Sequence, residues 1–334
     1  MNPILRAAPT LRSVPDVTPA SSDNSRPDAN ADVSSGIKAG FVAYVVWGLL
    51  TIYWKQLGAF NAVELIGWRI ITAGMVMILV ISVRRRWAAI RAVFADRRLT
   101  MRIAAAAALL TGNWTAYVYA VVHDRVIETA LGYFMAPLGT MALGIIFLKE
   151  RPTLGQKAAM ALAVVAVAVL AVSYGRPPYM AFIIAVSWSF YGLLKRQVPL
   201  SAVDSLAAET FVLLIPAMVV AGVMAGRNGS IPRSADVGEL ALVSFAGIAT
   251  VVPLTLFAFA ALRVPFTILG PLTYLVPTIN FLLGWLFYDE DMPWSRLLGF
   301  GFVWLALAVV TFDRLRTTVS ARRKVPELRP ATPD

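Results

Sequence analysis

Residues 137–150 of this chain read PLGTMALGIIFLKE, and residues 277–290 read PTINFLLGWLFYDE. At one constant shift along the chain, Pro137, Gly144, Phe147 and Glu150 return as Pro277, Gly284, Phe287 and Glu290. Lys55 returns as Lys195 at the same shift. Duplicated hydrophobic halves are typical of transporters that carry substrate between two related helix bundles. We therefore expect two repeats, at residues 37–173 and 174–313.

The composition indicates a membrane protein. The 334 residues are 58% hydrophobic and 15% charged, with a mean hydropathy of +0.70, well above a soluble domain. The net charge of +11 does not predict a nucleic-acid partner, because the basic residues stand at the ends of apolar segments. With no cysteine and one histidine we expect no metal site and no cofactor, and no phosphate-binding G-x-x-x-x-G-K-[ST] motif suggests an ATP-driven pump.

Ten stretches are apolar and long enough to cross the bilayer as helices, which takes about 20 residues each. They are residues 38–57, 64–83, 102–121, 128–148, 154–173, 178–195, 206–225, 238–261, 267–287 and 295–313. Residues 84–101 form the longest connection and the most basic one. The expected fold is an all-α integral membrane protein with five crossings in each half.

The distribution of basic residues predicts the orientation. One side of the expected membrane collects 23 of the 30 lysines and arginines, the other side has six, and Arg69 lies inside a helix. The positive-inside rule puts the side with 23, and both termini, in the cytoplasm of a multi-pass plasma (inner) membrane protein. Five crossings per half then invert the second repeat relative to the first. Residues 1–36 and 314–334 are expected to be polar cytoplasmic tails, the first of them disordered, and Trp54, Trp87 and Trp294 are expected at the membrane interfaces.

Several phrases of this sequence resemble one transporter family. They are WGLLTIYWK at 47–55, NWTAYVYAV at 113–121, LGYFMAPLG at 131–139 with FLKER at 147–151, YGLLKR at 191–196, PLTLFAFAALR at 253–263 and LGPLTYLVPT at 269–278. Together they resemble the EamA family of the drug/metabolite transporter superfamily, and within it the RarD-type permeases. The resemblance covers roughly residues 38 to 313.

This resemblance implies a ten-helix inner-membrane permease that exports small metabolites or drugs. The chain departs from the family pattern at two positions. Trp68 precedes Arg69 where we expect a histidine, and Thr273 precedes Tyr274 where we expect a glutamine. Both positions are expected to face the substrate, so the ligand of a relative does not carry over to this chain.

Two prolines indicate where a cavity is expected. Tyr133, Pro137 and Thr140 share one face of the fourth predicted helix. The equivalent positions of the ninth predicted helix hold Thr273, Pro277 and Asn280. A proline frees a backbone carbonyl, which is tolerated at membrane depth where it lines a cavity. The alternative is that the prolines only set helix curvature.

The first and sixth predicted helices each carry aromatic and polar residues that end at a lysine. These are Trp47, Thr51 and Lys55 in the first, and Trp188, Tyr191 and Lys195 in the sixth. The rings are candidates for stacking on substrate, or for simple packing. The lysines, together with Glu64 and Glu209, are candidate gating residues, or they extend their amines to the membrane surface.

Arg69 is the single most informative residue, because a charge inside a membrane helix costs about 2.5–3.5 kcal/mol. We expect it to bind an anion or to gate; the alternative is a pair with an acidic residue at a helix end. Asn113 and Tyr117, one helical turn apart, are expected to hydrogen-bond substrate or a neighbouring helix.

The pattern therefore predicts a secondary transporter that is not an enzyme. An intramembrane enzyme acting on lipid-linked substrates is the alternative, and it would need a cluster of catalytic carboxylates or metal ligands. Proton coupling, the substrate and the oligomeric state stay open at this point.

Overall fold

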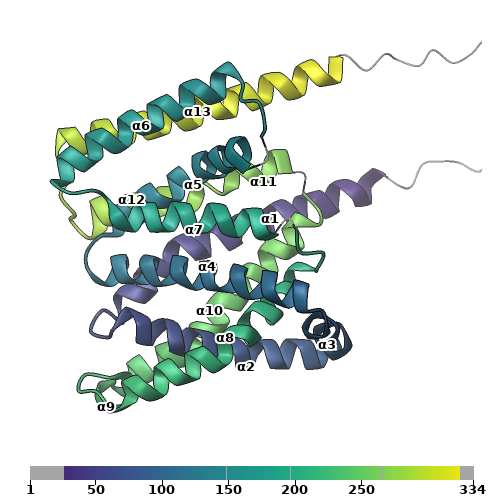
Figure 1. The fold of residues 1–334 in the computed structure, drawn as a ribbon, viewed down its shortest axis with the longest axis vertical. Helices are drawn as coiled ribbons and strands as arrows, with labels where there is room; N and C mark the ends of the chain where they lie inside the picture. The colour runs from purple at the N-terminus through teal and green to yellow at the C-terminus, as the bar shows by residue number, and fades with distance from the viewer. Residues whose placement is uncertain (1–25, 148, 196, 265, 324–334) are drawn as a thin grey trace, which may run out of the picture.

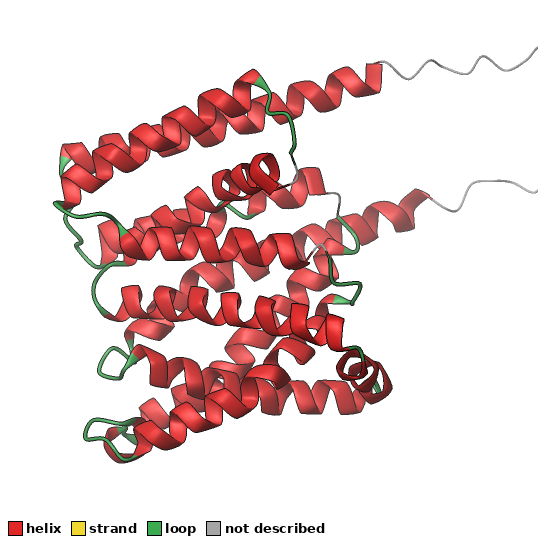
Figure 2. Cartoon of the chain, in the orientation of Figure 1, coloured by secondary structure: helices red, strands yellow, loops and turns green. Residues whose placement is uncertain are grey.

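The computed structural model describes residues 26–147, 149–195, 197–264 and 266–323, and the regular elements in these ranges are all helices (Figures 1 and 2). Within them nine helical segments are long and apolar enough to cross a membrane, and α7 is a shorter apolar helix. These segments are α1 (Arg26–Lys55), α2 (Ala62–Val83), α4 (Arg97–Val122), α5 (Val126–Phe147), α6 (Leu154–Tyr174), α7 (Tyr179–Lys195), α8 (Ala202–Ala225), α10 (Val237–Ala261), the run of α11 (Phe266–Leu272), α12 (Leu275–Leu282) and the π-helix η1 (Leu283–Phe287), and α13 (Trp294–Arg323). The chain is an all-helical membrane protein.

Polar side chains at the loop ends decide where several helices begin. Asn61 accepts the backbone N–H of Val63 at the start of α2, and Ser201 accepts that of Asp204 at the start of α8. Asn61 and Ser201 occupy equivalent positions of the two sequence repeats. Such caps satisfy backbone donors that have no partner inside the helix.

Three predicted boundaries were wrong. α1 begins at Arg26, so residues 26–36 are helical rather than part of a disordered tail, while residues 1–25 lie outside the described structure. α13 continues to Arg323, beyond the expected end at 313, and residues 324–334 again lie outside it. The basic connection at 84–101 contains a short helix, α3 (Trp87–Ala95), and the first turn of α4.

The helices of the two halves pack in matched pairs. α6 packs on α13, and α2 packs on α8. The α1–α10 contact has a counterpart in α7–α4, and the α1–α12 contact has one in α7–α5. Figure 1 shows α6 and α13 together at one end of the molecule and α2 and α8 toward the other. The contacts between the halves therefore recur with the roles of the two repeats exchanged, and α6–α13 and α2–α8 are contacts between helices that the sequence repeat relates to each other.

The backbone itself repeats at the end of α5 and of η1. Lys149 and Asp289 both adopt a left-handed conformation, with φ of 54° and 51°. In the next residues, the N–H of Glu150 donates to Gly144 O at 3.2 Å and that of Glu290 to Gly284 O at 2.9 Å. The repeat in sequence is thus a repeat in conformation.

The two proline-containing helices differ. α5 runs unbroken through Pro137. Its counterpart is interrupted at Thr273 and Tyr274, between α11 and α12, and it ends in a π-helix. Pro271 lies just before the break and Pro277 just after it, so two prolines act where α5 has one. The break therefore lies in the second half only.

One glycine brings α2 and α10 into contact. A Cβ at Gly247 would lie 2.4 Å from the backbone carbonyl carbon of Thr72, so no larger residue fits there. Small residues at helix crossings are the usual way for membrane helices to approach closely. Arg69 lies one turn before Thr72 and Thr250 lies one turn after Gly247, and this crossing brings the two into contact.

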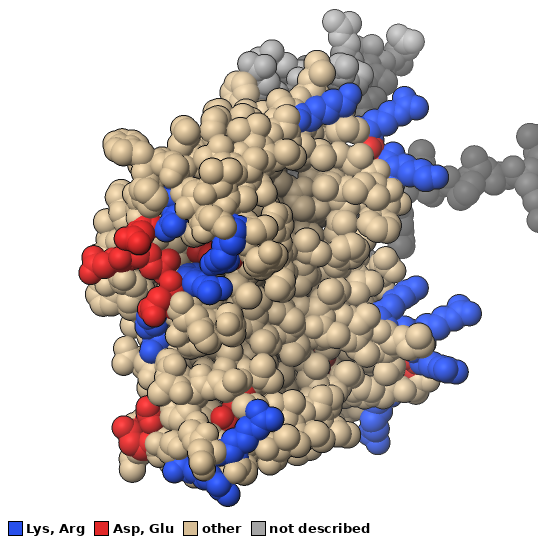
Figure 3. Space-filling view, turned by 60° about the vertical axis from the view of Figure 1, so that its left-hand side comes forward, with Lys and Arg blue, Asp and Glu red and all other residues tan. Residues whose placement is uncertain are grey.

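Charged side chains gather at two edges of the molecule with an uncharged band between them (Figure 3). One edge mixes acidic and basic residues. The opposite edge, where α1 begins and α13 ends (Figure 1), is predominantly basic on this face. The described ends of the chain thus lie at the same edge, as an even number of crossings requires.

Candidate functional site

Arg69 lies in the interior, 5% exposed, among helices of both halves. Its Nε donates to Thr250 Oγ1 of α10 at 2.8 Å. Its guanidinium carbon lies 3.9 Å from the ring centre of Trp114 on α4 and 5.5 Å from that of Trp54 on α1. Among the described residues, no Asp or Glu forms an ion pair with it. We call Arg69, Trp54, Trp114 and Thr250 the arginine site.

Beside the arginine site lies a hydrogen-bonded group, the central polar cluster, formed by Thr51, Asn113, Tyr117, Thr129, Tyr133, Ser187 and Asn280. Thr51 Oγ1 donates to Asn280 Oδ1 at 2.9 Å and lies 2.8 Å from Tyr117 Oη, which must then be the donor to Thr51. Asn280 Nδ2 donates to Thr129 Oγ1 at 3.2 Å. α12 of the second half is thereby tied to α1, α4 and α5 of the first.

Asn113 makes the second set of bonds in this cluster. It accepts from Tyr133 Oη at 3.1 Å and donates to Ser187 Oγ at 3.1 Å and to Ile184 O at 3.0 Å. Asn113 is fully buried, so these partners satisfy a polar group that would be costly in an apolar interior. This set ties α4 and α5 to α7 of the second half.

A line of rings leads from the central polar cluster toward the end of α7. Tyr117 and Tyr133 have ring centres 6.0 Å apart, Tyr133 and Trp188 are 6.2 Å apart, and Trp188 and Tyr191 are 5.7 Å apart. Tyr117 is buried, whereas Trp188 is 41% exposed. The rings therefore connect the interior with the edge where α7 ends.

The buried carboxylates are engaged elsewhere. Glu64 accepts the backbone N–H of Ile231, and Glu128 binds Arg176 and the N–H of Met180. Asp204 binds Arg86, and Glu209 binds Lys195 at 2.7 Å. The sequence left open that Arg69 pairs with an acidic residue at a helix end. Among the described residues, the structure contains no such pair. For two cations outside the membrane segments, Arg86 and Arg176, the bonded carboxylate raises the pKa.

At the end of α1, a set of contacts joins α1, α4, α5 and the residues after η1 at the edge opposite the described chain ends; we call it the outer latch. Lys55 Nζ contacts Asp124 and donates to Val121 O at 3.1 Å. Glu290 accepts the N–H groups of Val126 and, at 3.0 Å, of Ile127 in the first turn of α5. A carboxylate at a helix N-terminus is electrostatically favourable. Burial nevertheless raises the pKa of Glu290, against the lowering effect of these N–H donors and of Lys55.

The related positions in the second half are arranged differently. Lys195 contacts Ser205 and Glu209, and Tyr191 Oη donates to Glu209 at 3.2 Å, so this set joins α7 to α8. Glu150, the counterpart of Glu290, is exposed, and its carboxylate lies over Gly144 of its own half. The contacts at the two ends of the molecule therefore differ.

Of the predicted cavity residues, Thr51, Asn113, Tyr117, Tyr133 and Asn280 meet in the central polar cluster. Others lie apart from it. Trp47 packs on Tyr44 and Phe257. Thr140 bonds Ala136 O of its own helix, and Thr273 bonds Gly270 O at the break before α12. Pro137 lies half-buried in α5, and Pro277 is buried in α12. Of the polar residues beside the two prolines, Tyr133 and Asn280 therefore belong to the central polar cluster, whereas Thr140 and Thr273 do not.

Three partners were missed from the sequence. Trp54, expected at a membrane interface, is 1% exposed and lies beside Arg69. Thr250 and Thr129 looked like ordinary hydroxyl residues of apolar helices. The only local signal was that Thr250 lies one turn after Gly247, where α10 meets α2.

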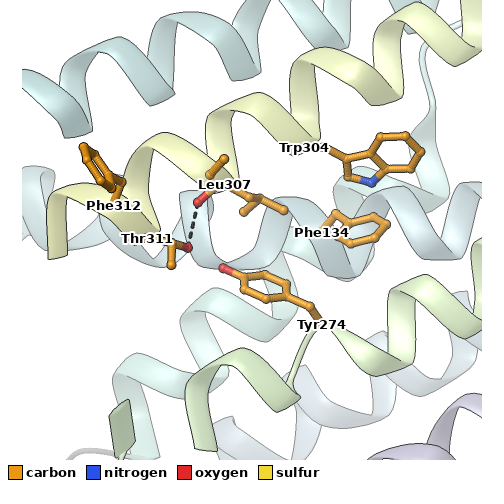
Figure 4. A pocket seen from close by; sticks show the side chains of 7 residues that line it. Phe134, Tyr274, Trp304, Leu307, Thr311 and Phe312 are labelled. Atoms are coloured by element: carbon orange, nitrogen blue, oxygen red, sulfur yellow. Dashed lines mark hydrogen bonds between the residues drawn. The ribbon is translucent and has the colours of Figure 1, made fainter. Parts of the chain in front are cut away.

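Two hollows in the molecule have apolar linings. One, of about 460 Å³, lies between Phe134 of α5, Tyr274 before α12, and Trp304 and Leu307 of α13 (Figure 4). The Thr311 hydroxyl beside it bonds Leu307 O of its own helix. The other, of about 400 Å³, lies between α5, α6 and α7. Arg69 lines neither hollow. Tyr274, a predicted cavity residue, therefore lines an apolar hollow that is separate from the arginine site.

Comparison with known proteins agrees with this architecture. The EamA-like transporter family matches residues 34–172 and, a second time, residues 177–312. Protein RarD of Streptomyces exfoliatus is 38% identical over 91% of this chain and 96% of its own length, and Protein RarD of Escherichia coli is 32% identical over 84% and 95%. An uncharacterized transporter of Pseudomonas aeruginosa is 36% identical over 86% and 97%.

One crystal structure superposes on this chain with a TM-score of 0.53 at 20% sequence identity. The match covers 86% of this chain and 98% of the chain in that structure, and it supports the fold alone. The resemblance to EamA and RarD proteins expected from the sequence is confirmed. Of the described residues, none form a group of three or more His, Asp or Glu that could hold a metal ion.

Proposed function

Because this chain belongs to the EamA-like transporter family, we propose that it is a secondary transporter that exports small metabolites or drugs by alternating access between two inverted repeats. One observation carries the proposal: the central polar cluster is built from α1, α4 and α5 of the first half and α7 and α12 of the second. Transporter substrates bind at such repeat interfaces near the bilayer midplane. Rocking one half against the other would break and remake these bonds.

In this proposal the chain crosses the plasma membrane ten times, with α7 as the sixth crossing and both termini in the cytoplasm. The basic edge in Figure 3 supports this orientation. The matched helix pairs support a pseudo-twofold axis in the membrane plane. On this assignment the outer latch faces the outside.

The difference between the two ends supports a structure that is closed toward the outside. The outer latch joins α1 to the end of α4, and the residues after η1 to the start of α5. Among the described residues, Lys195 instead pairs with Glu209 of α8, and Glu150 lies over Gly144 of its own half. Alternating access needs a state in which the outer latch is broken. In that state Glu290 leaves the first turn of α5, and Lys55 leaves Asp124.

The alternative, an intramembrane enzyme, finds less support. Such an enzyme needs carboxylates or histidines that converge on a substrate, whereas the buried carboxylates here bind cations and helix N-termini. The only histidine, His123, is stacked on Tyr119 at the membrane edge.

Flux through purified protein in liposomes tests the proposal. A panel of carboxylates, amino acids, sugars, amines and antibiotics should include at least one solute whose efflux depends on the protein. Thr51→Val removes two bonds of the central polar cluster and should lower this flux. Thr311→Val is the matched control, since its hydroxyl bonds only its own helix, and it should transport normally. Equal flux in both variants, or the absence of protein-dependent flux for the whole panel, would contradict the proposed role.

A further inference from the structure

The arginine site combines one buried cation with a buried indole N–H that has no acceptor among the described residues. Arg69 is 5% exposed, and the described chain places no carboxylate against it. The indole N–H of Trp54, which is 1% exposed and whose ring lies beside Arg69, has no hydrogen-bond partner among the described residues. A buried donor without an acceptor costs about 1–3 kcal/mol. The site thus lacks an acceptor and a negative charge.

We propose that the arginine site binds the carboxylate of an organic monoanion, which is the transported substrate. This inference rests on the proposed transport function and names its substrate class. The guanidinium suits a carboxylate, because its planar N–H groups can donate two parallel bonds to the two oxygens. Nε is already held by Thr250 at 2.8 Å, which fixes the plane of the group and leaves its terminal nitrogens for the ligand.

The charge of the ligand follows from the charge of the site. Lys55 and Lys195 are bound to Asp124 and Glu209, and Arg176 to Glu128, so these cations are already neutralised. One guanidinium then balances one negative charge. A dianion such as a phosphate monoester would carry an uncompensated charge into the membrane interior, which is costly.

The surrounding rings indicate the rest of the ligand. Trp114 covers one face of the guanidinium at 3.9 Å, which holds its edge free for bonds in its own plane. Tyr117 and Tyr133 continue from the arginine site toward the exposed Trp188. A carboxylate attached to an apolar, planar body fits both features, because rings stack favourably at such separations.

Four probes that share a phenyl ring test the charge requirement on the unmodified protein in detergent. Phenylacetate should raise the thermal unfolding midpoint in a saturable way. Phenylacetamide, which is neutral, and phenethylamine, which is cationic, should not. Phenyl phosphate, added as a dianionic comparison, should stabilise less than phenylacetate. Equal effects of acid and amide, a larger effect of the amine or of phenyl phosphate, or no effect of phenylacetate would overturn the proposal.

Two arginine substitutions test the location. Binding of radiolabelled phenylacetate should be lost in Arg69→Gln and weakened about tenfold in Arg69→Lys, which keeps the charge without the planar fork. Arg263→Gln is the matched control, because Arg263 also stacks on a ring, that of Phe259, but pairs with Asp32 near the membrane surface. Undiminished binding in Arg69→Gln would overturn the proposal. If Arg69→Gln fails to fold, Thr250→Val serves instead, since it should weaken phenylacetate binding while the arginine remains.

The same protein in liposomes separates this inference from the transport function. Protein-dependent efflux of amines or sugars, without efflux of carboxylates, would overturn the monoanion and leave the transporter intact. Phenylacetate binding that depends on Arg69, without protein-dependent flux of any solute, would overturn the transport function and leave the binding site.

Discussion

Glu290 accepts the backbone N–H of Ile127 at 3.0 Å, across 163 residues of sequence. This contact joins the connection between η1 and α13 to the first turn of α5. Its counterpart, Glu150, is exposed. Two equivalent glutamates in one chain thus occupy different environments.

Removing the Glu290 carboxylate should open the outer end. Hydrogen bonds to a charged group contribute about 1.5–3 kcal/mol each, so Glu290→Ala should raise the open population about tenfold or more. The reporter is Thr129→Cys, one turn below the latch in α5, in a chain without native cysteine. A membrane-impermeant thiol reagent added outside should label it faster in the Glu290→Ala background.

Asn228→Cys is the control for this experiment, because it lies exposed in the loop after α8 and should react equally in both backgrounds. If Thr129→Cys is labelled at the same rate with and without Glu290→Ala, while Asn228→Cys reacts normally, Glu290 does not stabilise a closed outer end.

The outer latch should also respond to pH. Burial raises the pKa of Glu290 above its ordinary value of 4.5, so the latched state binds a proton more tightly than an open state in which the carboxylate faces water. The stabilisation by protonation is therefore present at low pH and is lost as the pH rises through the raised pKa. Labelling of Thr129→Cys, normalised to Asn228→Cys at each pH, should slow on acidification toward 4.5. In the Glu290→Gln background, which cannot titrate, this slowing should disappear; if it persists, another group is responsible.

Lys195 and Glu209 should be energetically coupled, so that removing one partner costs more stability than removing both. Glu209 is 1% exposed, so Lys195→Met leaves a buried carboxylate without its cation, a change that typically costs about 3–5 kcal/mol. Thermal unfolding in detergent should show a large loss for Lys195→Met and a smaller one for Lys195→Met with Glu209→Gln. Arg263→Met, which breaks a pair whose Asp32 is 58% exposed, should change stability by at most about 1 kcal/mol. Additive losses in the double variant would show that the pair has no coupling.

Gly247→Ala should separate α2 from α10. Its new methyl would lie 2.4 Å from the Thr72 backbone, which cannot yield as a flexible side chain could, and overpacking of this kind costs about 1–3 kcal/mol. The unfolding midpoint and phenylacetate binding should both fall, since the crossing sets the distance between Arg69 and Thr250. Gly222→Ala on α8 is the control, because nothing lies within 4 Å of its added methyl. Equal midpoints for the two variants would refute the tight crossing.

Reporter fusions test the orientation. A fluorescent protein that folds only in the cytoplasm, fused after Asp334, should be bright. A phosphatase that is active only outside, inserted at Asn228, should be active. The reversed pattern would overturn the inverted assignment, because the distribution of lysine and arginine is its main support.

The sequence by itself determined the class of protein, the number of apolar segments and the duplication of the chain. These depend on properties that are local or periodic: the length of an apolar run, the position of basic residues, and phrases that recur at one constant spacing. They also placed Thr51, Asn113, Tyr117, Tyr133 and Asn280 among the candidate residues, because polar groups within apolar helices are few.

Only the tertiary structure decided which of those groups meet. Thr250 lies 181 residues from Arg69, and it is the crossing at Gly247 that brings the two together. Likewise Trp54, at a helix end by sequence, is buried in a cluster with apolar side chains of α2 and α4. Pro137 and Pro277 look equivalent in sequence, yet only the second helix is broken. Several local conformations of each helix have similar energies, and contacts between distant segments decide which one forms. No single segment of the sequence therefore determines it.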